Sequence, residues 1–299
     1  MIRRHPIAAL AVSSICFALM AIATRELSLR GYTTAELVVW RMGIGAIGCY
    51  PILRASGETL WVDRKALMLW RSLVGAAAIV TYFWSISLLP VGLATLFNYL
   101  GPLFTTLFAA RFLGERPGGR LLLGMLVAFA GAMFTVRSAV GSSALGFGIG
   151  YFGVAVGVCS AVCQGAAVTL IRKLRRTEGA TTIFFWFSVV TTVCCLPFAL
   201  ASLHLPPGHD LPLLFGMAAA SLAAQLLFTA ALGHVPAATY SILSPLTPAT
   251  AFVVGAWLLA EPITARVAAG ALLAVLGVAV GTLGWPCQRR PPKGAVAPA

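Results

Sequence analysis

Acidic side chains are scarce in this chain: eight Asp and Glu residues stand against 21 Lys and Arg residues, and only 10 % of all residues are charged. Histidine is rarer still, with four residues at the ends of apolar runs or between them. The sequence therefore shows no cluster of histidines and carboxylates, no cysteine and histidine spacing that suits a metal ion, and no glycine-rich phosphate loop. These absences disfavour an enzyme, a resident metal ion and an organic cofactor.

Cysteine is present but forms no pattern of ligands. The seven cysteines are an odd number, and nearly all of them fall inside apolar runs. We expect them to act as small apolar packing residues.

What the chain has in abundance is apolar surface: 60 % of its residues are hydrophobic and its mean hydropathy is +0.93. A soluble core of 299 residues could not bury that much, so the sequence indicates an all-α integral membrane protein. A helix needs about 20 mostly apolar residues to cross a bilayer. Ten such runs are expected, at residues 6–24, 35–53, 66–88, 91–113, 119–137, 146–170, 180–203, 211–232, 236–259 and 264–285.

The net charge of +13 reflects membrane topology rather than nucleic-acid binding. With the N-terminus inside, 15 Lys and Arg residues fall on the cytoplasmic side and four on the other, and two more lie within spans. This predicts a plasma (inner) membrane protein with both termini in the cytoplasm. A cleavable signal peptide is the competing interpretation of residues 1–24, but this run is long enough to span and has no A-x-A-like cleavage site.

The chain repeats itself at a constant shift of 146 positions. Pro90, Pro102, Leu113, Glu115, Arg120, Gly124 and Gly131 recur as Pro236, Pro248, Leu259, Glu261, Arg266, Gly270 and Gly277. We therefore expect two five-helix repeats, residues 1–145 and 146–285, followed by a disordered cytoplasmic tail at 286–299. Because five is odd, the second repeat enters the bilayer inverted, an architecture typical of secondary transporters.

Two segments carry a family resemblance: LLPVGLATLFNYLGPLFTTLFAARFLGE, from residue 88, and HVPAATYSILSPLTPATAFVVGAWLLAE, from residue 234. With them, the chain resembles the drug/metabolite transporter superfamily, in its ten-helix form with two EamA-type domains. The resemblance implies a central cavity formed mainly by helices 1, 3, 4, 6, 8 and 9, and a small organic metabolite as the substrate.

Polar residues of the fourth span share one helical face. Thr95, Asn98, Pro102 and Thr105 correspond to Ser241, Ser244, Pro248 and Ala251 in the second repeat. Such a stripe predicts cavity-lining groups, although hydroxyls that bond back to their own helix are the alternative. Pro102, Pro245 and Pro248 predict kinks, either as hinges for gating or as static bends.

The third span offers a second stripe, in which Arg71, Gly75, Ala78 and Tyr82 correspond to Met217, Ser221, Ala224 and Phe228. Tyr82 is predicted to stack on a planar or apolar part of a substrate. Gln164 and Gln225 are further mid-depth candidates, for which interhelical hydrogen bonding is the alternative role.

Arg41 and Arg71 are the most informative residues, because an arginine centred in a bilayer costs roughly 2.5–3.5 kcal/mol. Snorkelling to headgroups would explain Arg71, and bonds to helix-end carbonyls would explain Arg41. The functional alternative is that one of them attracts a carboxylate or phosphate of the substrate, which would then be anionic or zwitterionic.

Together these features predict a secondary transporter that alternates access to a site between its repeats. A non-transporting membrane subunit or a lipid-handling protein is the other interpretation. With no proton-relay set in view, exchange or facilitated movement is as plausible as proton coupling. Small residues in the fifth and tenth spans predict close helix packing and leave room for a homodimer.

Overall fold

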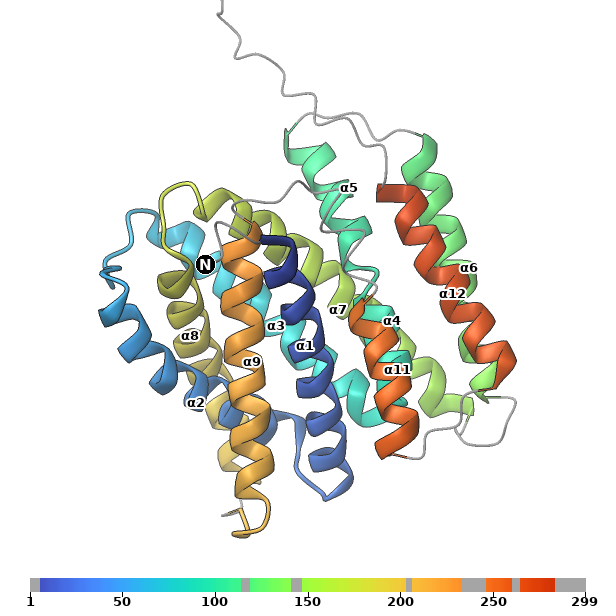
Figure 1. Cartoon of the computed structure of the whole chain (residues 1–299), viewed down its shortest axis with the longest axis horizontal. Coiled ribbons are helices and arrows are strands. Elements are labelled where there is room, and N and C mark those ends of the chain that lie inside the picture. Colours follow the sequence, from blue (N-terminus) through green and yellow to red (C-terminus); the bar gives the residue numbers. More distant parts are fainter. Residues whose placement is uncertain are drawn as a thin grey trace, which may run out of the picture.

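The computed structural model describes residues 6–113, 119–140, 147–202, 206–232, 246–259 and 264–282. Within these ranges the chain forms eleven α-helices and no strand (Figure 1). The predicted all-α membrane fold is confirmed. The predicted tail at 286–299 lies outside the described residues.

The first repeat contains six of these helices: α1 (Pro6–Leu29), α2 (Thr34–Ala55), α3 (Lys65–Leu88), α4 (Val91–Asn98), α5 (Gly101–Leu113) and α6 (Gly119–Val140). The turn between α1 and α2 is specified locally. Gly31 takes a φ of 98°, which favours glycine, and Thr33 with Glu36 forms a capping box at the start of α2.

The second repeat contains α7 (Phe147–Leu174), α8 (Ala180–Leu200), α9 (Leu211–Leu232), α11 (Leu246–Leu258) and α12 (Ala265–Thr282). Six described helices, namely α1, α2, α3, α7, α8 and α9, are long and apolar enough to cross a membrane. Shorter apolar helices lie in the remaining predicted spans.

The fourth predicted span is interrupted, because α4 ends at Asn98 and α5 begins at Gly101. Pro102 has no N–H to donate to the carbonyl four residues earlier, that of Asn98. The N–H groups of Leu100 and Leu103 instead donate to carbonyls three residues back. In the second repeat, Pro248 lies in the first turn of α11, where proline is tolerated.

The helices pack as an inverted repeat requires. The corresponding helices α2 and α8 contact each other, as do α6 and α12, and the contact of α1 with α9 matches that of α3 with α7. The carbonyls of the corresponding residues Ala78 and Ala224 both meet a serine hydroxyl from a helix of the other repeat. The Ser13 hydroxyl lies 2.9 Å from the carbonyl of Ala224, and the Ser160 hydroxyl lies 3.0 Å from that of Ala78.

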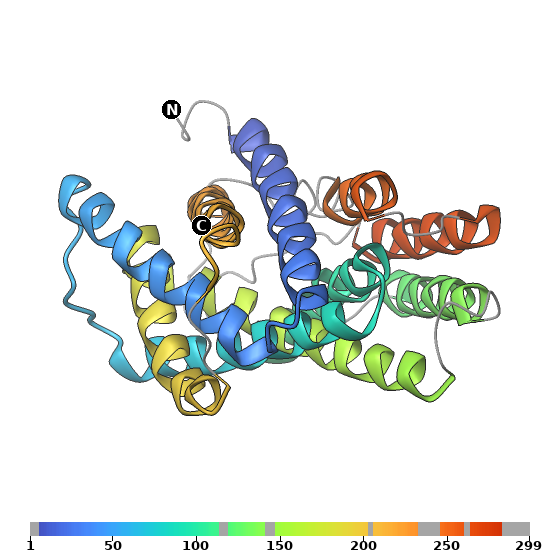
Figure 2. The ribbon, with the colours of Figure 1, turned by 90° about the horizontal axis from the view of Figure 1, so that it is seen from below.

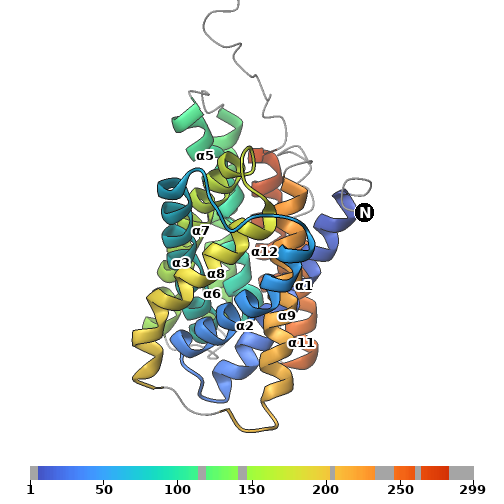
Figure 3. The ribbon, with the colours of Figure 1, turned by 90° about the vertical axis from the view of Figure 1, so that its left-hand side faces the viewer.

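The pairing produces two layers with a helix pair at each end. Figure 3 shows α3 and α7 on one side and α1, α9 and α11 on the other, and Figure 2 shows the same separation from below. The α2/α8 pair lies at one end of the molecule and the α6/α12 pair at the other (Figure 1). The space between the layers is where a site lined by both repeats must lie.

Small residues allow α6 and α12 to approach closely, as their spacing predicts. A Cβ added to Gly131 would overlap the backbone of Ala274, and one added to Gly277 would overlap that of Ala128. These small residues are therefore used for packing within one chain. The suggested homodimer stays a prediction, but without these faces to support it.

Candidate functional site

A cavity of about 110 Å³ lies between the two layers and is lined by residues from both repeats. Nine predicted site residues line it: Arg41, Arg71, Tyr82, Thr95, Asn98, Pro102, Gln164, Gln225 and Pro248. The other three, Ser241, Ser244 and Pro245, lie outside the described residues. The arrangement brings together candidates from helices α2, α3, α4, α5, α7, α9 and α11.

Tyr82 is held in place through its hydroxyl group. The Tyr82 and Thr95 hydroxyl oxygens lie 3.0 Å apart, and the Thr95 hydroxyl is 2.7 Å from the carbonyl of Val91. Because Thr95 has only one hydroxyl proton, donating it to Val91 leaves Tyr82 as the donor to Thr95. Both interpretations of Thr95 therefore apply at once. Its hydroxyl bonds back to its own helix, and it also fixes an aromatic ring of the cavity.

Asn98 is the last residue of α4, beside the break in that span. Its side-chain carbonyl accepts a hydrogen bond of 3.0 Å from Ser160 on α7. The same hydroxyl lies 3.0 Å from the carbonyl of Ala78 on α3, so α3, α4 and α7 meet at this point. With its carbonyl engaged, Asn98 has amide N–H groups to offer a solute acceptor.

Arg71 does not snorkel to the membrane surface. Its side chain is only 2 % exposed, and its guanidinium carbon lies 4.0 Å from the centroid of the Phe187 ring. A Cβ at Gly75 would overlap both the guanidinium and this ring, so glycine leaves the space that Arg71 occupies. Among the described residues, its Nε and Nη1 atoms have no hydrogen-bond partner.

Arg41 is also 2 % exposed, and it is not held by helix-end carbonyls in the described structure. Its Nε donates to the hydroxyl of Ser221 on α9, and its guanidinium carbon lies 5.3 Å from the centroid of the Phe83 ring. Its Nη1 has no partner within the described ranges. Both arginines therefore face the cavity with hydrogen-bonding capacity to spare.

The remaining predicted residues differ in the hydrogen bonds and packing contacts that they make within the protein. Gln225 donates to Thr229 over a long 3.4 Å, and the Gln164 side chain lies over Gly101. Thr105 is absent from the lining of the cavity and bonds to its own helix at 3.0 Å. Three residues of the predicted stripe on the fourth span, Thr95, Asn98 and Pro102, therefore line the cavity.

Several aromatic lining residues escaped the sequence interpretation, namely Phe17, Tyr99 and Phe187. Tyr82 and Phe228 both line the cavity, but the ring partner of Phe228 is Phe17, at 6.0 Å between centroids. A signal for Phe187 did exist, because it stands 146 positions after Arg41.

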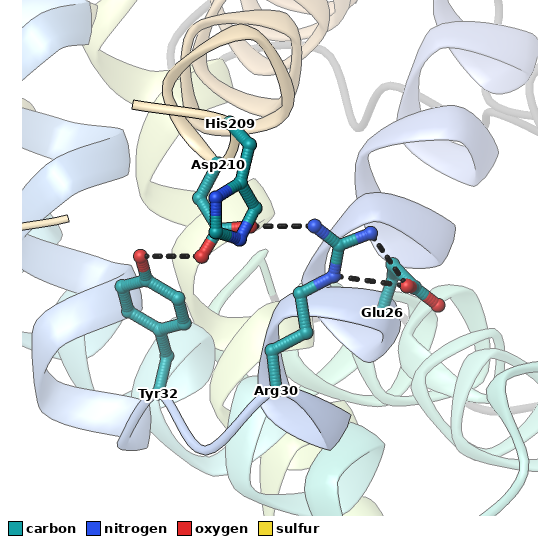
Figure 4. A network of polar contacts seen from close by, with 5 residues as sticks. All are labelled: Glu26, Arg30, Tyr32, His209 and Asp210. Carbon is teal, nitrogen blue, oxygen red and sulfur yellow. Dashed lines mark hydrogen bonds and ion pairs between the residues drawn. The ribbon is translucent and has the colours of Figure 1, made fainter. Parts of the chain in front are cut away.

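Outside the cavity, the described acidic residues serve helix ends and loops. Figure 4 shows Asp210 at the start of α9, accepting hydrogen bonds from Arg30 and from the hydroxyl of Tyr32. The Arg30 hydrogen bond lowers the pKa of Asp210, while burial and the Asp210 hydrogen bond raise the pKa of Tyr32 to about 12. This network, with Glu26 bound to Arg30 at 2.8 Å, ties the turn between α1 and α2 to α9.

Comparison with known proteins places this arrangement among membrane transporters. The sequence profile of the EamA-like transporter family matches residues 5–137 and 151–283. The pseudopaline exporter of Pseudomonas aeruginosa (strain UCBPP-PA14) is 29 % identical over 232 residues, covering 77 % of this chain and 79 % of the exporter. The riboflavin transporter of Rhizobium johnstonii is 25 % identical over 230 residues, covering 76 % of this chain and 74 % of that protein.

A solved crystal structure supports the fold alone. It superposes with a TM-score of 0.70 at 18 % identity, covering 92 % of this chain and 96 % of the other.

Proposed function

Because this chain belongs to the EamA-like transporter family, we propose that it is a secondary transporter that carries a small organic metabolite through the cavity between its repeats. It is an integral membrane protein and not an enzyme. The observation that carries the proposal is the position of the cavity: residues of both repeats line it, and such interfaces hold the substrate site in inverted-repeat transporters.

The size of the cavity supports alternating access. Ligand pockets commonly measure about 300–1,000 Å³, whereas this one measures about 110 Å³. A metabolite therefore enters only after the helices around the cavity move apart. The interruption between α4 and α5, with Pro102 beside it, provides a place where one helix half tilts against the other. Pro248 holds the corresponding place in the second repeat.

The distribution of basic residues supports an orientation with both termini in the cytoplasm, in a plasma (inner) membrane. In that orientation the network around Asp210 closes the outer side, because it joins the outer turn after α1 to the outer end of α9. On the opposite side, Glu58 in the loop before α3 accepts hydrogen bonds from the N–H groups of Thr181 and Thr182 at the start of α8.

The names of the relatives support a small organic solute, since one is a pseudopaline exporter and the other a riboflavin transporter. In this chain Asn98 and Gln164 would hydrogen-bond the solute, and Tyr82 would pack against an apolar or planar part of it.

Proteoliposomes containing the purified full-length chain test the proposal. Vesicles loaded with a defined mixture of cationic, neutral and anionic metabolites should lose particular members faster than protein-free vesicles, as followed by mass spectrometry. If no solute in a broad mixture moves in either direction, this proposal is contradicted. Such a result would favour a non-transporting membrane subunit or a lipid-handling protein.

A further inference from the structure

Two buried guanidinium groups face one cavity, and both have unused donors. Arg41 and Arg71 are each 2 % exposed, and both line the cavity. Nη1 of Arg41, and Nε with Nη1 of Arg71, have no hydrogen-bond partner within the described part of the chain. A buried cation with unsatisfied donors is costly unless an anion meets it.

The chain supplies no such anion from the described residues, since none of their carboxylates lines the cavity. Glu58 binds the N-terminus of α8, and Asp210 binds Arg30 and Tyr32. Glu115 and Glu261 lie outside the described residues. In the sequence, Glu115 comes two positions after the end of α5, and Glu261 comes three positions after the end of α11. The cavity therefore carries a positive charge of two with no described carboxylate to balance it.

The two arginines are fixed separately. Arg41 is held between Ser221 on α9 and the Phe83 ring, whereas Arg71 lies over Gly75 and the Phe187 ring of α8. A guanidinium packed against a ring keeps its N–H edge available for a carboxylate.

They also stand at different depths. At 1.5 Å per residue, Arg41 lies about 10 Å along α2 and Arg71 about 9 Å along α3. Consecutive spans begin on opposite sides of the membrane, so these distances are measured from opposite surfaces.

From this geometry we infer that the transported solute carries two separated anionic groups, one for each arginine, and an apolar or planar part between them. The inference rests on the proposed transport function and narrows its substrate class to organic dianions such as dicarboxylates. The rings of Tyr82 and Phe187 provide the apolar contact, and the Asn98 amide donates to a polar group along the solute.

Binding is measured with the purified full-length chain by the shift of its thermal unfolding midpoint. The probes are malonate, succinate, glutarate and adipate, compared with acetate, butyrate, inorganic phosphate and choline at equal ionic strength. One length of dicarboxylate should stabilise the protein most, because the two guanidiniums are fixed in place. Equal stabilisation by monocarboxylates, or preference for choline, would overturn the inference.

Variants test whether the two arginines act together. Arg41→Gln and Arg71→Gln should each weaken dicarboxylate binding roughly tenfold or more, since each removes a charge-assisted hydrogen bond. Lysine at either position keeps the charge but loses the planar fork, so it should bind with intermediate affinity. Arg54→Gln serves as the matched control, because Arg54 is exposed in the last turn of α2.

Gly75→Ala is a second kind of variant, which keeps both charges. The added methyl group would displace the Arg71 guanidinium and the Phe187 ring, so dicarboxylate affinity should fall while Arg41 is unchanged. Gly43→Ala is its control, since nothing lies within 4 Å of a Cβ at that position. Unchanged dicarboxylate binding in Gly75→Ala and in both glutamine variants would contradict the inference.

Flux separates this inference from the proposed function. If vesicles containing the protein release neutral solutes but no dicarboxylate, the proposed transport function is supported and the inferred dianion site is contradicted. If dicarboxylates bind through both arginines but no solute crosses the membrane, the inferred dianion site is supported and the proposed transport function is contradicted.

Discussion

The two repeats share the glycines that pack α6 against α12 but differ in the charged residues that face the cavity. Gly131 and Gly277 occupy corresponding places, and both lie against backbone in the contact between α6 and α12. Around the cavity the match is only partial: Pro102 and Pro248 correspond, whereas the positions of Arg41 and Arg71 hold Phe187 and Met217 in the second repeat. The close backbone contact between α6 and α12 requires small residues in both copies, whereas among the described residues only the first copy places charged side chains in the cavity.

This difference distinguishes positions that helix packing constrains from positions that the chemistry of the cavity constrains. Ser221 corresponds to Gly75, yet Ser221 binds Arg41 while Gly75 makes room for Arg71. The same pair of positions thus supports both arginines in different ways. Substitutions at the shared glycines of α6 and α12 should therefore change folding, and substitutions at the unshared cavity positions should change transport.

The largest expected effect is at a shared glycine. Gly131→Ala would drive a methyl group into the backbone of α12, which cannot move away as a flexible side chain could. Stability should fall by roughly 1–3 kcal/mol, measured by thermal unfolding of the purified protein. Gly216→Ala, where nothing lies within 4 Å, is the control, and equal unfolding midpoints for the two variants would contradict the packing account.

Tyr82 is an unshared position, since its counterpart is Phe228, and its ring and its hydroxyl can be tested separately. Tyr82→Ala should reduce solute flux several-fold, because it removes the ring that lines the cavity and leaves Thr95 without its partner. Tyr82→Phe keeps the ring and should reduce flux less. If both variants transport at the wild-type rate while reaching the membrane, Tyr82 does not contact the solute.

Asn98→Ala is expected to have a smaller effect. Loss of one hydrogen bond to a solute should weaken binding by roughly 0.5–1.5 kcal/mol, read as a rise in the half-saturating solute concentration. Thr105→Val is the comparison, since Thr105 belongs to the same sequence stripe but does not line the cavity. An equal change in both variants would point to an effect on helix packing rather than on solute binding.

The smallest effect concerns pH and the network of Figure 4. Because the Arg30 hydrogen bond lowers the pKa of Asp210 from its ordinary value of 3.8, the stabilisation is present above that value. It is lost as the pH falls through the lowered pKa. Asp210→Asn should therefore unfold at a lower temperature than the wild type at neutral pH and converge with it in strong acid. A gap that persists in acid would contradict this assignment.

Much of the architecture follows from the sequence, for physical reasons. Long apolar runs and a constant shift of 146 positions leave few arrangements other than inverted repeats. The cavity-facing positions of Asn98, Pro102 and Tyr82 follow as well, since polar, proline and aromatic residues on one helical face have few other places to lie in a membrane.

What the sequence could not determine depends on contacts between distant helices. The Arg71 side chain stacks on Phe187, more than 100 positions away, and no local pattern predicts that contact. From its position off the polar stripe of the fourth span, Tyr99 would be expected to face away from the cavity, yet it lines the cavity. The interruption between α4 and α5 removes the helical periodicity on which that expectation was based.

The central claim is that solute passes through the cavity between the repeats, and thiol labelling tests it most directly. Gln164→Cys would be made in a chain whose seven native cysteines are replaced by alanine, with Val253→Cys on the exposed face of α11 as the control. A methanethiosulfonate reagent should block flux only in the Gln164→Cys protein, and excess transported solute should slow the labelling. Full flux through a completely labelled Gln164→Cys protein would contradict the account.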